Sequence, residues 1–170
     1  MADLTRGRVI AKIRAGESLE GADLSGLDIT GANLSSGDLK GANLKGANLT
    51  GAYLTGTHLE GASLERADLK SARLRSANLS EANLSGAKLI RTDMSGANLS
   101  GANLSDADLS DANLWKANLT GANLLHANLT RALMAMANLR GANLIQADLT
   151  ETQLIRAELT DTILPEGFEE

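Results

Sequence analysis

The amino-acid sequence repeats every five residues from Leu19 to Leu164, with no residue inserted or deleted. Leucine stands at every fifth position of this stretch, except where Ile29, Met94 and Met134 replace it, and the residue two positions earlier is usually alanine. The stretch therefore contains thirty five-residue units in one register, which we call pentads. Because such units bury their apolar residues only against neighbouring units, the repeat indicates a solenoid.

The spacing excludes the two regular structures that a long repeat could form. Five residues of α-helix turn the chain by about 500°, so the leucines would spiral around the helix axis. In a continuous strand, an odd spacing would put successive leucines on opposite faces. The spacing suits a short extended piece followed by a bend. Thirteen pentads have glycine two residues after the leucine, and glycine readily adopts the backbone conformations of a bend.

Charged side chains indicate how many pentads make one coil. Coils about 4.8 Å apart place residues of adjacent coils side by side, where unlike charges attract and like charges repel. At a separation of twenty residues the repeats contain nine opposite-charge pairs and no like pair. Separations of fifteen and twenty-five residues produce like pairs, such as Asp93 with Asp108 and Asp68 with Asp93, so the charges predict four pentads per coil. The nine pairs are Glu20–Lys40, Lys40–Glu60, Lys45–Glu65, Asp68–Lys88, Lys88–Asp108, Arg73–Asp93, Arg91–Asp111, Asp111–Arg131 and Arg131–Glu151.

Pentads such as Gly-Ala-Asn-Leu-Ser and Asp-Ala-Asn-Leu-Trp, which follow one another between Gly96 and Thr130, share the pattern A(D/N)LXX. In this pattern the chain resembles the pentapeptide-repeat family over about 150 of its 170 residues. The resemblance implies an all-β solenoid, namely a right-handed quadrilateral β-helix with four pentads per coil. In that fold the central leucine and the preceding alanine point inward. The thirty pentads would form about 7.5 coils, a rod roughly 36 Å long.

Residues 4–15 (LTRGRVIAKIRA) interrupt the repeat and predict a short amphipathic helix. Val9, Ile10 and Ile13 form its apolar face, and Thr5 suits the N-cap. A solenoid exposes its core at each end, and a terminal unit with one apolar face is the usual cover. We therefore expect a short N-terminal capping helix. A basic helix on a membrane surface is the alternative, for which twelve residues are short.

We expect three parts: an N-terminal capping helix in residues 1–16, a pentapeptide-repeat β-helix in 17–165, and a C-terminal tail in 166–170 whose Phe168 folds over the last coil. The absence of cysteine excludes disulfides and thiolate metal sites. No apolar run reaches membrane-spanning length, and the N-terminus lacks a signal-peptide pattern. A cytoplasmic protein with no membrane partner is therefore expected.

Charge is distributed unevenly along the chain. Residues 40–91 hold eight basic and four acidic side chains, whereas residues 93–170 hold four basic and eleven acidic ones. Several basic residues would gather around one corner of the solenoid, a candidate contact for anions or nucleic acid. We expect no direct nucleic-acid binding, because neighbouring aspartates can pair with three of these residues and no aromatic residue lies between them. This basic corner consists of Lys70, Arg73, Arg75, Lys88 and Arg91.

Outward positions become apolar in the C-terminal half. Trp115, Ala135 and Ile155 are twenty residues apart and should stack in one column, while Leu125 and Ile145 form a second column on the opposite face. A contiguous apolar column that contains the only tryptophan is a candidate interface with another protein or with a second copy of the chain. An incidental surface is an equal alternative. The candidate interaction surface consists of Trp115, Leu133, Ala135, Met136 and Ile155.

The sequence offers little support for catalysis. The two histidines, His58 and His126, are 68 positions apart and fall on different faces, so they cannot act together. Asp38 lies one coil from His58, which predicts a surface pair. No serine has an evident base, and no nucleotide-binding or metal-binding motif is present. We therefore expect no enzyme activity, no cofactor and no metal.

Two classes of function are left. The first is a non-enzymatic rigid rod that serves as a structural or protein–protein interaction module of unknown partner. The second follows from the resemblance, since some pentapeptide-repeat proteins are DNA mimics that bind DNA gyrase and protect it from quinolones or toxins. A rod of roughly 36 Å would need on the order of twenty negative charges to match duplex DNA, whereas the chain has a net charge of −5. The mimic therefore ranks second, and its acidic surface would consist of Asp106, Asp108, Asp111, Asp148 and Glu151.

Overall fold

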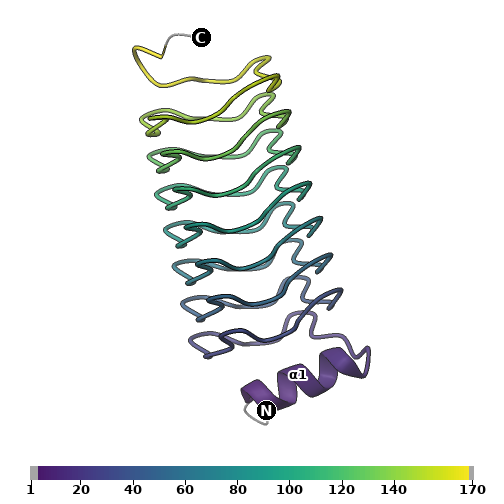
Figure 1. Ribbon diagram of the computed structural model, residues 1–170. Helices are drawn as coiled ribbons and strands as arrows, with labels where there is room; N and C mark the ends of the chain where they lie inside the picture. Colours follow the sequence, from purple (N-terminus) through teal and green to yellow (C-terminus); the bar gives the residue numbers. More distant parts are fainter. Residues whose placement is uncertain (1–3, 169–170) are drawn as a thin grey trace.

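The computed structural model describes residues 4–168, which form flat coils stacked into a rod (Figure 1). The only helix in this part of the chain, α1 (Arg6–Arg14), lies across the N-terminal end of the stack, and the C-terminus lies at the other end. The described residues contain no continuous strand; isolated parallel bridges join neighbouring coils. Residues 1–3 and 169–170, parts of the expected N-terminal segment and tail, lie outside the described residues.

Every bridge joins two residues twenty positions apart, from Asp23 with Asn43 to Asn143 with Ile163, so one coil takes four pentads. The amide of the central residue in each pentad from Leu19 to Leu144 donates to a carbonyl of the next coil, as in the 2.7 Å hydrogen bond from Leu84 to Asn103. This pairing satisfies backbone groups that the narrow core would otherwise leave without partners.

The bends between the extended pieces are hydrogen-bonded turns. The carbonyl oxygen of Leu84, for example, accepts a 3.0 Å hydrogen bond from the amide of Ala87. The third residue of that turn, Gly86, has a φ of 63°, which is the left-handed conformation that a type II turn requires. The sequence predicted this role for glycine. It did not predict that sixteen other residues, among them Ser71 and Arg131, adopt a positive φ at the same position.

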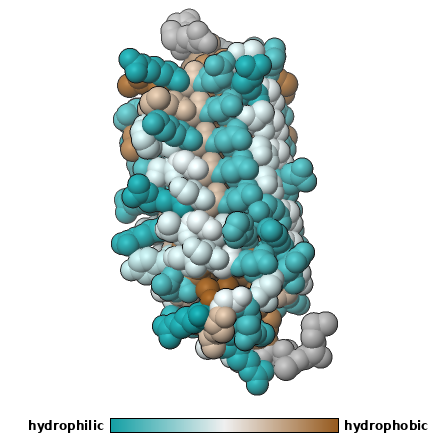
Figure 2. All heavy atoms as spheres, turned by 90° about the vertical axis from the view of Figure 1, so that its right-hand side faces the viewer, coloured by the Kyte–Doolittle hydropathy of each residue, from teal (hydrophilic) through white to brown (hydrophobic). Residues whose placement is uncertain are grey.

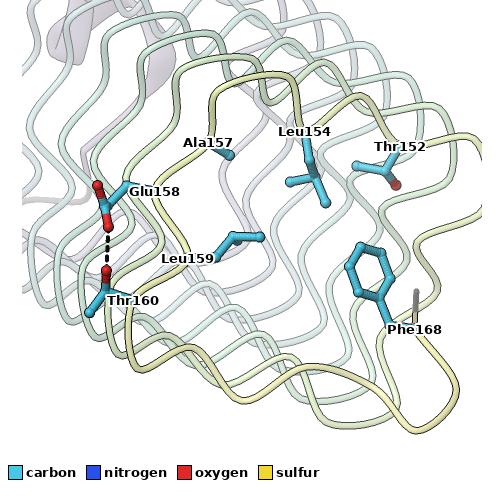
Figure 3. A pocket seen from close by; sticks show the side chains of 7 residues that line it. All are labelled: Thr152, Leu154, Ala157, Glu158, Leu159, Thr160 and Phe168. Atoms are coloured by element: carbon cyan, nitrogen blue, oxygen red, sulfur yellow. Dashed lines mark hydrogen bonds between the residues drawn. The ribbon is translucent and has the colours of Figure 1, made fainter. Parts of the chain in front are cut away.

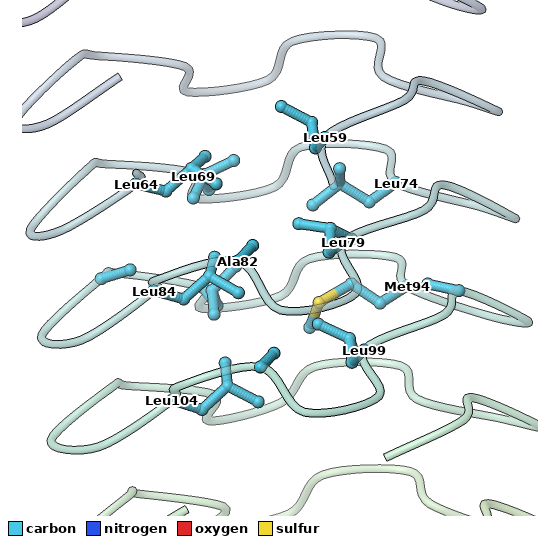
Figure 4. Packing of buried hydrophobic residues seen from close by; sticks show 14 of the residues in the cluster. Leu59, Leu64, Leu69, Leu74, Leu79, Ala82, Leu84, Met94, Leu99 and Leu104 are labelled. Carbon is cyan, nitrogen blue, oxygen red and sulfur yellow. The ribbon is translucent and has the colours of Figure 1, made fainter. Parts of the chain in front are cut away.

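Leucine and alanine fill the interior. Figure 4 shows Leu64, Leu84 and Leu104 stacked in one ladder, and Leu74 above Met94 in another. These side chains are fully buried. Burial of each leucine stabilises the fold by about 1.5–3 kcal/mol relative to an exposed leucine. The expected core of inward leucine and alanine is confirmed.

Threonine replaces alanine at a few inward positions without leaving its hydroxyl unpaired. Thr57 and Thr92 are fully buried, and their hydroxyl groups donate to the carbonyl oxygens of Leu34 and Leu69 in the coil below, both at 3.0 Å. These bonds offset the cost of burying a polar group.

An outward asparagine or aspartate stands before most of the central leucines and stabilises the backbone in two ways. Its side-chain oxygen accepts the amide proton two residues later, as in the 3.1 Å bond from Ser85 to Asn83. Asparagines in one column also bind each other between coils: Asn98 donates to Asn78 at 3.0 Å, and Asn118 donates to Asn98 at 3.1 Å. In Figure 2 polar side chains form vertical columns, while brown apolar spheres are clearest near the lower end.

The helix predicted over residues 4–15 forms as α1, and the Thr5 hydroxyl accepts a hydrogen bond from the amide of Arg8 at its N-cap. Val9 is fully buried, and Ile13 packs against the core. Gly37 stands where most pentads have alanine, and a Cβ there would lie 2.5 Å from Cδ1 of Ile13. The missing methyl group thus makes room for the helix. No helix within residues 4–168 is long and apolar enough to cross a membrane.

Candidate protein-interaction surface

Two outward columns of side chains form one face of the rod, which we call the Trp115 face. Bridges join Asn113 to Leu133 and Leu133 to Gln153 in the first column. Trp115 and Ala135 follow one another in the second column, and both columns line a groove of about 400 Å³. The first column consists of Tyr53, Arg73, Asp93, Asn113, Leu133 and Gln153, and the second of Thr55, Arg75, Ser95, Trp115, Ala135 and Ile155.

Large apolar side chains are exposed at the C-terminal half of this face. The exposed fractions are 44% for Trp115, 40% for Leu133 and 66% for Ile155, and Met136 at the adjoining corner is 45% exposed. The ammonium group of Lys116 lies 4.3 Å from the centre of the Trp115 ring, in a cation–π contact. The structure thus brings together the residues that the sequence singled out as an apolar column.

The opposite face also carries exposed apolar side chains. Ile145 is 41% exposed and Ile163 is 52% exposed. They are fewer than on the Trp115 face, and they include no aromatic ring. A single exposed aliphatic residue is common on protein surfaces, so Ile145 serves below as a matched control.

The basic corner is mostly neutralised. Lys70 lies 3.4 Å from Asp68, Arg75 lies 3.8 Å from Asp93, and Arg91 lies 3.9 Å from Asp111. These are exposed ion pairs of small energetic value. Three of the five basic residues therefore have acidic neighbours, the number that the sequence predicted, but only Arg91 has the partner expected from the twenty-residue interval.

One expectation about the basic corner is wrong. The sequence indicated no aromatic residue among the basic ones, but the guanidinium of Arg73 lies 4.7 Å from the centre of the Tyr53 ring. These residues are bridged between adjacent coils. The spacing of twenty residues that predicts the charge pairs also joins Tyr53 to Arg73, so this contact could have been found from the sequence.

The acidic residues do not form a continuous negative strip. Asp108 and Asp148 lie in one column with the neutral Asn128 between them, and Arg131 lies between Asp111 and Glu151 in another. Asp111 accepts hydrogen bonds of 2.7 Å and 3.0 Å from the Arg131 guanidinium, which lowers the pKa of its carboxyl group.

Asp148 and Asp106 of the acidic set have partners nearby. A hydrogen bond from the hydroxyl of Thr150 lowers the pKa of Asp148. Asp106 lies 3.3 Å from Nδ1 of His126. The acidic side chains thus mainly bind residues of their own or the adjacent coil.

The histidines take part in surface contacts. Asp38 and His58 are bridged in adjacent coils, as expected for a surface pair, but Nδ1 of His58 lies 3.3 Å from Glu60 and the carboxyl group of Asp38 accepts a hydrogen bond from Ser18. In the part of the chain that the structure describes, no group of three or more His, Cys, Asp or Glu residues is arranged to hold a metal ion.

The C-terminal end contains a larger hollow, of about 700 Å³. The sequence predicted that Phe168 lies over the last coil, but it did not predict this hollow. Figure 3 shows Leu154, Ala157 and Leu159 pointing into it, with the Phe168 ring at its edge. A hydrogen bond joins Thr160 to Glu158 on its wall. The hollow is the open interior of the last coil at the C-terminal end of the rod (Figure 3).

These features define a solenoid of five-residue units with a filled core and outward columns of side chains. The family model described as Pentapeptide repeats matches the sequence in eight copies between residues 18 and 165. The chain therefore belongs to the pentapeptide-repeat family.

Solved structures of similar proteins agree with this assignment. A pentapeptide repeat protein (Rfr23) from the cyanobacterium Cyanothece 51142 is 46% identical, with a TM-score of 0.53, over 54% of this chain and 63% of that one, which is less than two thirds of its length. HetL, a pentapeptide repeat protein involved in heterocyst differentiation regulation in the cyanobacterium Nostoc sp. strain PCC 7120, is 28% identical over 99% of this chain and 100% of its own, with a TM-score of 0.50.

A more distant structure is that of QnrB1, a plasmid-mediated fluoroquinolone resistance protein. It is 19% identical over 80% of this chain and 76% of its own, with a TM-score of 0.36. No curated protein matches the sequence significantly.

Proposed function

We propose that the chain is a non-enzymatic rigid rod that acts as a protein–protein interaction module, with the Trp115 face as its contact surface. The observation that carries this proposal is the exposure of Trp115, Leu133, Met136 and Ile155 beside one groove. Tryptophan and methionine are enriched at protein interfaces, and a few such anchors usually carry most of the binding energy.

We further propose the detailed architecture that presents this face. It is a right-handed quadrilateral β-helix of about 7.5 coils in residues 17–165, with a capping helix in 1–16 and a tail in 166–170. The regular bridges and the burial of Val9 against the first coil support this description. Close packing of leucine ladders makes the rod stiff, so that each column keeps a fixed spacing toward a partner.

A DNA mimic that binds gyrase is the second candidate. The observation in its favour is the excess of seven acidic side chains between residues 93 and 170. Neutral Asn128 separates Asp108 from Asp148, and Arg131 separates Asp111 from Glu151. These interruptions weaken the likeness to a DNA backbone, which carries one negative charge per about 1.7 Å. The mimic therefore stays second.

Capture experiments test the first proposal. The wild type, Trp115→Glu and Ile145→Glu are immobilised and incubated with extract of the organism that encodes the protein. We expect a protein that wild type and Ile145→Glu retain and Trp115→Glu loses. Equal retention by all three would refute the Trp115 face as the contact surface. Inhibition of gyrase supercoiling by the wild type, unaffected by Trp115→Glu, would favour the DNA mimic instead.

A further inference from the structure

We infer that the Trp115 face binds a second copy of this chain, with the two rods antiparallel and face to face. This inference rests on the proposed function, because it names the partner of the same surface. Its arguments are the charge of the face, the order of charges along one edge, the shapes of opposing side chains and the available area.

The Trp115 face is nearly neutral although the C-terminal half of the chain is acidic. From Arg91 to Arg156, this face and its two edges hold four basic and three acidic residues, whereas residues 93–170 as a whole carry an excess of seven acids. The basic residues are Arg91, Lys116, Arg131 and Arg156, and the acidic ones are Asp93, Asp111 and Glu151. Two copies can therefore meet here with most of their negative charge directed elsewhere, which limits long-range repulsion.

One edge of the face sets the register. Arg91, Asp111, Arg131 and Glu151 follow one another at intervals of one coil, so positive and negative charges alternate. A two-fold axis can run across the face, perpendicular to the rod and midway between the coils of Asp111 and Arg131. This axis places Asp111 of each copy opposite Arg131 of the other copy. The same axis places Arg91 opposite Glu151 of the second copy. Such a two-fold interface is self-complementary.

The neighbouring registers are unfavourable. An axis at the level of Asp111 would bring Arg91 against Arg131 of the second copy. An axis at the level of Arg131 would bring Asp111 against Glu151. Like charges across an interface disfavour binding, so the alternation selects registers midway between coils. Among these, the axis between Asp111 and Arg131 joins the most unlike pairs.

The same register fits the side chains by size. It places Trp115 opposite Ala135 of the second copy, and Ala135 opposite the second Trp115. The large ring then enters the groove whose walls include Leu133 and Ala135. A large aromatic residue that fills a partner's pocket is a common binding anchor.

The overlapping area is sufficient for a specific dimer. Four of the thirty pentads of each rod overlap on this face. If every pentad has an equal share of the total accessible surface of 8052 Å², these four expose on the order of 1,000 Å². Standard interfaces bury about 800 Å² per partner.

Complementary charge reversal tests the geometry. In a homodimer of Arg131→Glu, Asp111 of each copy would face the introduced glutamate of the other. In a homodimer of Asp111→Arg, Arg131 of each copy would face the introduced arginine of the other. We expect a concentration-dependent dimer for the wild type in sedimentation velocity, and a dissociation constant at least about tenfold higher for each variant alone. A 1:1 mixture should recover dimers, because both opposing pairs then join unlike charges. Thermal unfolding by circular dichroism verifies that the variants are folded.

A wild type that stays at 17.7 kDa at every concentration overturns the inference. So does a dimer that the mixture fails to restore, since it would use another geometry. A parallel arrangement would place Asp111 and Arg131 away from each other and would also fail to recover. A monomer that still captures another protein through Trp115 overturns only this inference and leaves the proposed function standing.

Discussion

Ser71→Gly should stabilise the protein, although glycine usually destabilises regular structure. Ser71 occupies the third position of its turn with a φ of 55°. An L-residue in this left-handed conformation costs about 1–2 kcal/mol, which glycine avoids. Glycine in turn loses about 0.5–1 kcal/mol through greater freedom of the unfolded chain. The free energy of unfolding should therefore rise by about 0.5–1 kcal/mol.

Ser80 offers a matched control. It carries the same side chain at the preceding position of its own turn, and it does not have a positive φ. Ser80→Gly should therefore lower the free energy of unfolding by about 0.5–1 kcal/mol, because only the entropic cost applies. Urea unfolding monitored by circular dichroism measures both variants. A decrease of similar size for both would refute the argument that turn strain limits stability at Ser71.

Three further predictions concern the core, the helix and pH. Leu84→Ala removes a fully buried side chain from its ladder and should lower the free energy of unfolding by about 2–5 kcal/mol in urea titration; a loss below about 1 kcal/mol would contradict close packing. Gly37→Ala should lower the thermal midpoint because its Cβ would lie 2.5 Å from Cδ1 of Ile13 and 2.9 Å from the carbonyl oxygen of Leu34. In an Ile13→Ala background the same substitution should lower the midpoint less, because only the contact with Leu34 is left; an equal loss in both backgrounds would show that Ile13 does not contribute. Hydrogen bonds from Ser25 and Thr150 lower the pKa values of Asp23 and Asp148 in the folded protein. The two ionised carboxylates therefore stabilise the fold fully above the unfolded pKa of about 3.9, and this stabilisation is lost as the pH falls through the lower folded pKa values. Unfolding midpoints should thus be level from about pH 5 to 7 and fall below about pH 4; a rise on acidification would contradict this.

Much of the fold follows from the repeat because one spacing decides it. A leucine every five residues cannot serve a helix or a flat strand, and charges at intervals of twenty residues specify the coil. The bridges have that interval. Ion pairs follow the same interval at Lys45–Glu65 and Asp111–Arg131.

Other expectations failed because long side chains choose among several neighbours. Arg75 is the residue that lies near Asp93, where the interval of twenty had suggested Arg73. Arg73 lies over Tyr53 instead, and His58 contacts Glu60 in its own pentad. The interval fixes where a Cα lies, but the direction of a flexible exposed side chain depends on small differences in free energy.

The reason for Gly37 was also not evident from the sequence. Its place in the repeat marks it as a departure from alanine, but one of the two groups that a Cβ there would meet is Ile13, 24 residues earlier and outside the repeat, and the other is the carbonyl oxygen of Leu34. Contacts between the helix and the first coil depend on how α1 is oriented, and the periodic pattern contains no information about that orientation.

The emission spectrum of Trp115 tests the central claim most directly. The chain has one tryptophan, and it is 44% exposed on the proposed contact surface, so its fluorescence reports whether that surface is covered. We predict that its emission shifts to shorter wavelength and becomes less accessible to acrylamide as the protein associates with itself or with a captured partner. Association that leaves both the emission maximum and the quenching unchanged would show that the complex forms elsewhere on the rod, and would contradict the account.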